Sequence, residues 1–188
     1  MYKIFWLIRA FLYKPFFKNI GYLSYIGKPV FLHGISRVSL GKRVRIFPGV
    51  RIETHNKGSI VIHDDVGIGQ NFHIISGGVL SIGKKTIISA EVFINDMDNE
   101  YEEIGKNILE QRFIVNKTKI GEYCFIGIGA KIMSGTILGK QCIVGANSVV
   151  KGSFPDYSVI VGAPAKIVKR YNKEDGIWQK TNNQGEFI

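Results

Sequence analysis

An aliphatic residue recurs at every sixth position between Ile120 and Val150. A small residue, such as Cys124 or Ala130, follows the aliphatic one after four positions. This period matches neither the alternation of a strand nor the 3.6-residue repeat of a helix. A six-residue period with glycine after the aliphatic residue is typical of a parallel β-helix, whose short strands meet at tight turns and stack into coils. Each coil takes three hexapeptides, so we expect residues eighteen apart to stack. The ladder consists of Ile120, Ile126, Ile132, Leu138, Val144 and Val150.

The same ladder runs through the N-terminal half of the chain. Its spacing grows to ten residues after Ile52 and to eight after Ile74, which predicts small loops near residues 55–58 and 77–78. Between Ile94 and Ile120 the ladder stops, and residues 95–119 form a polar excursion too long for a tight turn. We therefore expect three coils before the excursion. Their ladder residues are Leu40, Ile46, Ile52, Ile62, Ile68, Ile74, Ile82, Ile88 and Ile94.

Residues 1–20 are apolar and aromatic, but lysines and one arginine interrupt them. No uninterrupted run reaches the ~20 residues that a transmembrane helix needs, and no clean signal-peptide pattern is present. The charges Lys3, Lys14 and Lys18 share one side of a helical projection, which predicts an imperfect amphipathic helix. Such a helix suits a membrane interface, or it packs against the β-helix or a neighbouring subunit. Both placements fit the sequence equally well.

The chain therefore divides into three parts and is expected to be an all-β protein. Residues 1–39 form an N-terminal helical segment and lead-in, and residues 40–160 form the β-helix with its protruding loop at 95–119. Residues 161–188 are expected to form a short basic helix that Pro164 starts or precedes, with a frayed tail from Lys180.

Charge and cysteine content narrow the range of partners. The net charge of +10 and pI near 9.6 indicate an anionic partner such as a phosphorylated cofactor, a membrane surface or nucleic acid. The basic residues are scattered and no nucleic-acid motif appears, so no nucleic-acid partner is expected. Cys124 and Cys142 are predicted to be buried small side chains in a reducing compartment. The histidines are not spaced to converge on a metal ion, and no metal is expected.

Three short segments carry a resemblance to a known family. They are ILEQ at 108–111, GANSVV at 145–150 and GAPAK at 162–166. With the repeats, over residues 40–178, the chain resembles the hexapeptide acyltransferases that acetylate sugars of bacterial capsules and O-antigens. The resemblance implies a left-handed coil, acetyl-CoA as donor, and a homotrimer with active sites between neighbouring subunits.

The resemblance also implies where acetyl-CoA binds. Its pantetheine arm is expected along the C-terminal coils, where small residues let an extended chain approach the backbone. Its nucleotide is expected near the GAPAK segment, where lysines supply charge for the phosphates. The residues implied for the arm are Phe125, Gly127, Ala130, Gly145, Ala146 and Ser148, and those for the nucleotide are Ala163, Pro164, Lys166 and Lys169.

The catalytic histidine of similar enzymes is missing. Acetyl transfer to a hydroxyl needs a general base, which the family supplies from a DHDH-like segment in the excursion. The matching positions hold Met97 and Asn99, neither of which serves as that base. His73 is the best substitute because it is expected to stack near Phe93, and Asp96 and Asp98 are alternatives. His33, His55 and His63 are expected to lie farther from the groove. The residues expected around the acceptor are Asn99, Tyr101, Glu110 and Gln111.

The leading hypothesis is therefore an acetyl-CoA-dependent sugar O-acetyltransferase of bacterial surface polysaccharide synthesis. The N-terminal segment favours a sugar or lipid-linked saccharide acceptor at the cytoplasmic face of the membrane. One alternative is an amino-sugar N-acetyltransferase, because a deprotonated amine needs less help from a base. Another is a non-catalytic hexapeptide protein that binds CoA or a partner enzyme, which the altered histidine positions favour.

Overall fold

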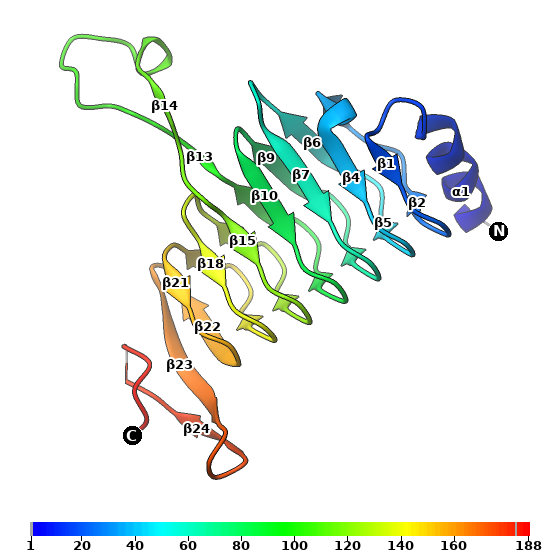
Figure 1. The fold of residues 1–188 in the computed structure, drawn as a ribbon. Coiled ribbons are helices and arrows are strands. Elements are labelled where there is room, and N and C mark those ends of the chain that lie inside the picture. Colours follow the sequence, from blue (N-terminus) through cyan, green and yellow to red (C-terminus); the bar gives the residue numbers. More distant parts are fainter. Residues whose placement is uncertain (1, 183) are drawn as a thin grey trace.

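The computed structural model, which describes residues 2–182 and 184–188, is a three-sided stack of coils (Figure 1). Each side is a parallel sheet, and successive strands along the chain pass from one sheet to the next. The first sheet contains β1 (Asn19–Ile20), β4 (Val38–Leu40), β7 (Ser59–Ile62), β10 (Val79–Ile82), β15 (Lys119–Ile120), β18 (Ile137–Leu138) and β21 (Ser153–Phe154). The second contains β2 (Tyr25–Ile26), β5 (Arg45–Ile46), β8 (Gly67–Ile68), β11 (Ile87–Ile88), β16 (Phe125–Ile126), β19 (Ile143–Val144) and β22 (Ser158–Gly162). The third contains β3 (Phe31–His33), β6 (Arg51–Thr54), β9 (His73–Ser76), β12 (Phe93–Asn95), β17 (Lys131–Ile132) and β20 (Val149–Val150). The predicted left-handed parallel β-helix is confirmed.

The aliphatic ladder forms the core of the stack. Its residues are almost completely buried, and each fully buried aliphatic side chain contributes roughly 1.5–3 kcal/mol of transfer free energy. The register continues across the excursion, since Ile82 pairs with Ile120 and Ile94 pairs with Ile132. Cys124 and Cys142 are free and buried, as predicted.

The stack begins one coil earlier than the sequence predicts. Ile20 pairs with Leu40 and Ile26 with Ile46, so the expected lead-in already contains strands of the first two sheets. The third sheet also starts in this segment, at β3. Glycine residues of this segment lie at tight corners between coils. At Gly27, for example, an added Cβ would meet the backbone nitrogen of Pro48 at 2.4 Å.

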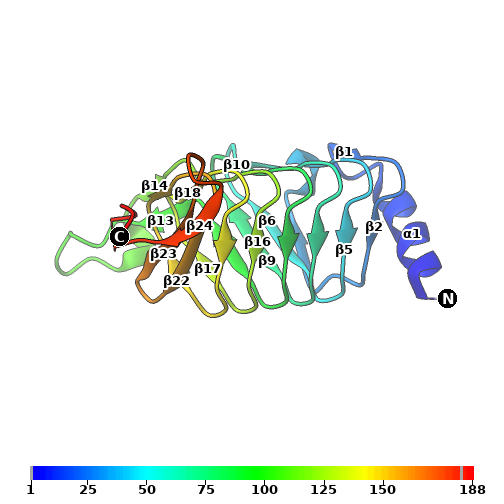
Figure 2. The same cartoon turned by 90° about the horizontal axis from the view of Figure 1, so that it is seen from below.

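Helix α1 (Tyr2–Tyr13) closes the N-terminal end of the stack, as Figure 2 shows. The Trp6 ring lies 5.7 Å from the Tyr25 ring and 5.4 Å from the Phe47 ring. Arg9 donates from Nη1 to the carbonyl of Ile26 at 3.2 Å, and Ala10 is buried. This side of the helix therefore packs on the first coils. In the part of the chain that the structure describes, no helix has the length and apolar character needed to cross a membrane.

The excursion is a two-stranded antiparallel ribbon that projects from the stack (Figure 1). Strand β13 (Met97–Asn99) pairs with β14 (Phe113–Val115), and a short 3₁₀ helix, η2 (Ile108–Glu110), lies near its tip. A second 3₁₀ helix, η1 (Ile35–Arg37), lies between the third and first sheets of the first two coils.

The predicted C-terminal helix is wrong. Residues 165–172 form β23 (Ala165–Asn172), which pairs antiparallel with β22, and β24 (Ile177–Lys180) pairs with β23. Ala165 and Ile167 are buried between exposed neighbours, which is the alternation of a strand. The physical reason is that β22 would otherwise leave an open sheet edge, and the hairpin covers it. The last residues are also tied down, because Thr181 bridges to Phe187.

Candidate active site

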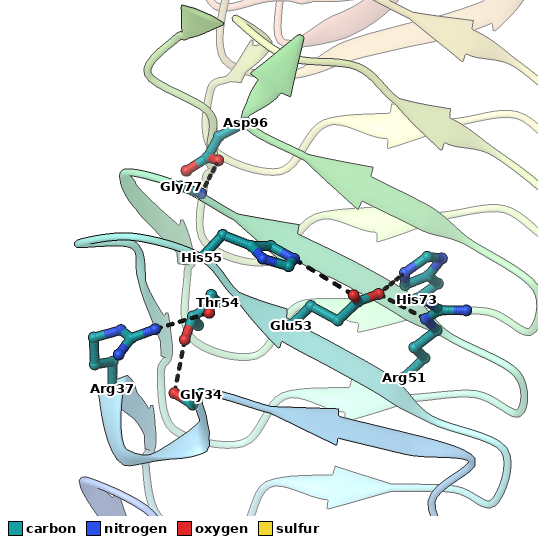
Figure 3. Close-up of polar contacts among 9 residues, drawn as sticks. All are labelled: Gly34, Arg37, Arg51, Glu53, Thr54, His55, His73, Gly77 and Asp96. Carbon is teal, nitrogen blue, oxygen red and sulfur yellow. Dashed lines mark hydrogen bonds and ion pairs between the residues drawn. The ribbon is translucent and has the colours of Figure 1, made fainter. Parts of the chain in front are cut away.

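Four charged or titratable side chains converge on the outer surface of the third sheet (Figure 3). Strand alternation turns Arg51 and Glu53 outward from β6, and the parallel register places His73 of β9 opposite Arg51. The Glu53 Oε1 atom accepts a hydrogen bond from Nε of Arg51 at 2.6 Å and lies 2.9 Å from Nε2 of His73. Its Oε2 atom lies 3.4 Å from Nε2 of His55, which follows β6 directly. We refer to Arg51, Glu53, His55 and His73 as the Glu53 cluster.

Glu53 is the buried centre of this cluster, with a side chain that is only 8% exposed. Burial opposes ionisation of Glu53, but the hydrogen bonds with Arg51 and His73 outweigh it and hold the pKa of this carboxyl below its ordinary value. The group is therefore a carboxylate near neutral pH. A buried carboxylate between two imidazoles favours their N–H tautomers toward it and stabilises either ring when it becomes charged.

A cavity of about 330 Å³ lies between the third sheet and the excursion ribbon. Buried polar atoms are normally hydrogen-bonded, yet Oδ1 of Asn95 and Oδ1 of Asn99 have no hydrogen-bond partner among the described residues. Both asparagines line the cavity, while these two oxygen atoms are themselves buried. The lining residues are His55, Asn56, Ile75, Asn95, Met97, Asp98, Asn99 and Phe113.

The structure changes the ranking of the histidines. His73 does lie beside Phe93, with ring centroids 5.1 Å apart, as the sequence predicts. The prediction that His55 lies farther from the site is wrong, because His55 lines the cavity and His73 is not among the described residues that line it. The signal was present in the sequence. The ten-residue spacing after Ile52 inserts extra residues at the corner between the third and first sheets, where the excursion also leaves the stack.

The two aspartates occupy different environments. Asp96 is completely buried and accepts hydrogen bonds from Ser76 Oγ at 2.7 Å, Gly77 N at 2.7 Å and Gly78 N at 3.2 Å. These three donors make it a support for the turn at 77–78, so its expected place among the candidate bases is not supported by the geometry. Asp98 lines the cavity, and its carboxylate lies 3.4 Å from Nζ of Lys151.

Of the four residues expected around the acceptor, only Asn99 lines this cavity. Gln111 is buried in the ribbon, where it accepts from the Glu103 amide at 3.1 Å and donates to the Lys106 carbonyl at 3.1 Å. It therefore shapes the ribbon tip. Tyr101 and Glu110 are exposed and are not among the described residues that line the cavity.

The residues expected to contact acetyl-CoA lie on the C-terminal coils and divide into two kinds. Phe125 is exposed on the second sheet, and Ala146 is exposed at the corner toward the third sheet. Ala130 and Ser148 are completely buried, and Ser148 Oγ accepts from the Gly162 amide at 3.1 Å. Their side chains shape the coils. Gly127 permits the next coil to approach, since a Cβ there would lie 2.6 Å from the Ala146 nitrogen.

The remaining expected contacts surround the start of the C-terminal hairpin. Gly145 lies at the same corner as Ala146, beneath β22. Lys166 and Lys169 are exposed on β23, so their ammonium groups are accessible to an anion. Ala163 and Pro164 form the exposed turn between β22 and β23. Among residues 2–182 and 184–188, no group of His, Cys, Asp or Glu is arranged to hold a metal ion.

Comparisons with known proteins agree with the fold and the repeat. The family model for bacterial transferase hexapeptide repeats (six repeats) matches residues 117–152. The putative lipopolysaccharide biosynthesis O-acetyl transferase WbbJ of Escherichia coli strain K12 is 31% identical over 178 residues, which cover 89% of this chain and 87% of that relative.

Two solved structures are similar to the whole stack. A variant of AntD, an N-acyltransferase from Bacillus cereus in complex with dTDP and coenzyme A, has a TM-score of 0.73 and 20% identity, covering 89% of this chain and 91% of that chain. A hexapeptide-repeat acetyltransferase from Vibrio cholerae, complexed with acetyl-CoA, has a TM-score of 0.64 and 20% identity, covering 89% and 78%. These two structures show the shared fold. Together with the extent of the Escherichia coli match, they show that this chain belongs to the hexapeptide-repeat acyltransferases.

Proposed function

We propose that this acyltransferase moves an acetyl group from acetyl-CoA to a sugar hydroxyl during the synthesis of bacterial surface polysaccharide. The observation that carries the proposal is the Glu53 cluster, whose His55 lines the cavity beside the excursion ribbon. An imidazole can take the proton of a sugar hydroxyl as a general base. The likeness to a putative O-acetyl transferase supports a saccharide acceptor, and a solved relative with acetyl-CoA supports the donor.

Acetyl-CoA is proposed to lie along the C-terminal coils toward the β22–β23 hairpin. Phe125 and Ala146 offer exposed surface to the pantetheine arm, beside Gly127 and Gly145. Ala130 and Ser148 contribute by keeping the adjacent coil narrow, because both are buried. The nucleotide is placed at Ala163 and Pro164, where Lys166 and Lys169 attract its phosphates.

An amino-sugar acceptor is the second candidate. AntD is an N-acyltransferase, and a free amine attacks a thioester without losing a proton to a strong base first. A histidine paired with a buried carboxylate favours the hydroxyl acceptor, since a hydroxyl depends more strongly on base catalysis. A non-catalytic role is less well supported because this chain has both a titratable cluster beside a cavity and a basic hairpin.

One experiment distinguishes these functions. Purified protein is incubated with acetyl-CoA and a panel of sugars, nucleotide sugars and amino sugars, while CoA release and the mass of each acceptor are followed. We expect acceptor-dependent CoA release and an acetyl mass increment that alkaline hydroxylamine removes, since esters are labile and amides are stable. A stable increment identifies N-acetylation. CoA binding without release for any acceptor would identify a binding protein.

The assembly and the location of the protein are also proposed. A homotrimer is expected from the family resemblance, and light scattering coupled to size-exclusion chromatography tests it. Helix α1 supports contact with the cytoplasmic face of an anionic membrane, because Ile4, Phe5 and Phe11 are 60%, 65% and 74% exposed. The exposed Lys14 lies beside Phe11, and Lys18 is also exposed. A lipid-linked saccharide acceptor would suit that location.

A further inference from the structure

We infer that His55 is the general base of the transfer and that Glu53, fixed by Arg51 and His73, positions it. This inference rests on the proposed function, because it names the group that takes the acceptor proton. His55 takes the role of the family histidine from another part of the stack, the corner between β6 and β7. A base at His55 would compensate for the loss of the family histidines, whose positions are occupied by Met97 and Asn99.

The residues that line the cavity favour His55 as the general base. Among the described residues that line it, His55 and Asp98 are the two with side chains that titrate. Asp98 lies 3.4 Å from Lys151 Nζ, so its carboxylate is already engaged in an ion pair. His63 lines a different cavity, with Lys84 and Lys140. His55 is therefore the imidazole with direct access to the cavity, and imidazole is the most common general base in enzymes.

The geometry of the Glu53 cluster sets the tautomer of His55. Its Nε2 atom faces Oε2 of Glu53 at 3.4 Å, while Oε1 is occupied by Arg51 and His73. A carboxylate accepts hydrogen bonds only, so the neutral imidazole carries its proton on Nε2 and leaves a lone pair on Nδ1. At 3.4 Å this is an ion-pair contact, and catalytic contacts are often long or poorly aligned until substrate binds.

In the proposed reaction, the proton that leaves the acceptor hydroxyl ends on the CoA thiol. The acceptor hydroxyl gives its proton to Nδ1 of His55 while its oxygen bonds to the thioester carbonyl carbon. The carbon–sulfur bond then breaks, and the imidazolium returns the proton to the sulfur, which leaves as the CoA thiol. Glu53 stays ionised throughout and stabilises the imidazolium. The products are the acetylated sugar and CoA.

Arg51 and His73 act on the carboxylate rather than on the acceptor. Arg51 holds Oε1 at 2.6 Å and itself stacks over the Phe31 ring, with Cζ 5.1 Å from the centroid. His73 holds the same oxygen from the next coil and packs on Phe93. With Oε1 secured from two sides, the carboxylate cannot rotate freely, and Oε2 remains directed toward His55. His73 is therefore a positioning residue.

The kinetic test compares three variants and one control in the full-length protein. His55→Gln removes the base and is expected to lower kcat by roughly 10²–10⁴-fold with little change in the KM for acetyl-CoA. His73→Gln keeps an N–H donor near Glu53 and is expected to cost much less. Glu53→Gln removes the charge that stabilises the imidazolium, so the acid limb of the pH profile shifts to lower pH. His63→Gln is the matched control and should leave kcat unchanged.

The pH dependence of kcat is expected to respond to the titratable groups near the His55 ring. Glu53 lies at Nε2, the His33 ring lies 5.3 Å from the His55 ring, and Asp98 lies on the same cavity wall. His33→Gln therefore serves as a second control. Only Glu53→Gln should move the acid limb strongly, because Glu53 alone in this group is a buried carboxylate in contact with the imidazole. Glu53→Asp should restore part of the shift.

The outcomes separate the inference from the proposed function. Active protein whose His55→Gln variant keeps full kcat would overturn the assignment and leave the function intact, and a larger loss in His73→Gln would transfer the role to His73. Nitrogen-15 spectra of the imidazoles give a result without any acceptor. We expect Nε2-protonated His55 in the neutral protein and a redistributed tautomer in Glu53→Gln. Nδ1 protonation of His55 would contradict the inference. A wild-type protein inactive with all acceptors would overturn both proposals.

Discussion

The Nε2 atom of His73 lies 2.9 Å from Oε1 of Glu53, twenty residues earlier and one coil below. A parallel register turns this sequence separation into direct contact, since Glu53 and Ile75 are paired across β6 and β9. The position of His73 in the repeat made it a candidate from the sequence alone. No sequence motif points to Glu53, its partner in this contact. The contact also links the stability of the third sheet to the ionisation of one buried group.

Acid should weaken this contact. The pKa of Glu53 is lowered in the folded protein, so its stabilising contribution is fully present above the unfolded-state pKa of about 4.3 and disappears as pH falls through the folded value. Glu53→Gln should lower the free energy of unfolding at neutral pH by about 1–3 kcal/mol. Thermal unfolding between about pH 3 and pH 7 should show a smaller pH dependence for this variant. An identical pH dependence in both proteins would contradict the coupling.

Asp96 should behave as a structural residue. Asp96→Ala leaves the Ser76 hydroxyl and the Gly77 and Gly78 amides without their acceptor, so we expect a loss of about 3 kcal/mol in unfolding free energy. Asp98→Ala removes one exposed ion pair and should cost at most about 1 kcal/mol. Urea unfolding measures both. An Asp96→Ala protein with native stability but no turnover would instead identify Asp96 as a base.

The exposed side of α1 should control membrane binding. Replacing Phe5 and Phe11 by serine should reduce pelleting with vesicles that contain anionic phospholipid, because both rings are exposed. The melting temperature should stay unchanged. Trp6→Ala is the contrasting variant, since its ring packs on Tyr25 and Phe47 and its loss should lower the melting temperature. Pelleting that persists in the double variant, or a loss of self-association detected by sedimentation, would refute a membrane role for this surface.

The basic hairpin should strengthen binding of CoA. Lys166→Ala with Lys169→Ala should weaken CoA binding roughly tenfold, which corresponds to about 1.4 kcal/mol. The difference should shrink at high salt, because exposed charges are screened. Isothermal titration with CoA and with dephospho-CoA measures the contribution of the phosphates. Lys57→Ala, in the exposed turn between β6 and β7, is the control and should bind CoA normally.

Much of the site could be located from spacing. The ladder lengthens after Ile52, Ile74 and Ile94, always at the end of a triplet, so these insertions occupy one corner of a three-sided stack. That rule brings the β6–β7 turn and the excursion together, so His55 lies close to residues 97–99. The buried cysteines and the continuous register across the excursion follow from the same period.

The sequence determined the β-helix and its coil register, because a strict six-residue period leaves one way to bury every ladder residue. It also determined that Met97 and Asn99 stand where similar enzymes carry histidine. The tertiary structure decided what that period does not constrain. The Glu53 cluster depends on outward-facing side chains of different coils, which carry no periodic signal. The conformation of residues 165–172 depended on the open edge of β22. A basic and aliphatic segment becomes a strand only when an unpaired sheet edge supplies its hydrogen bonds.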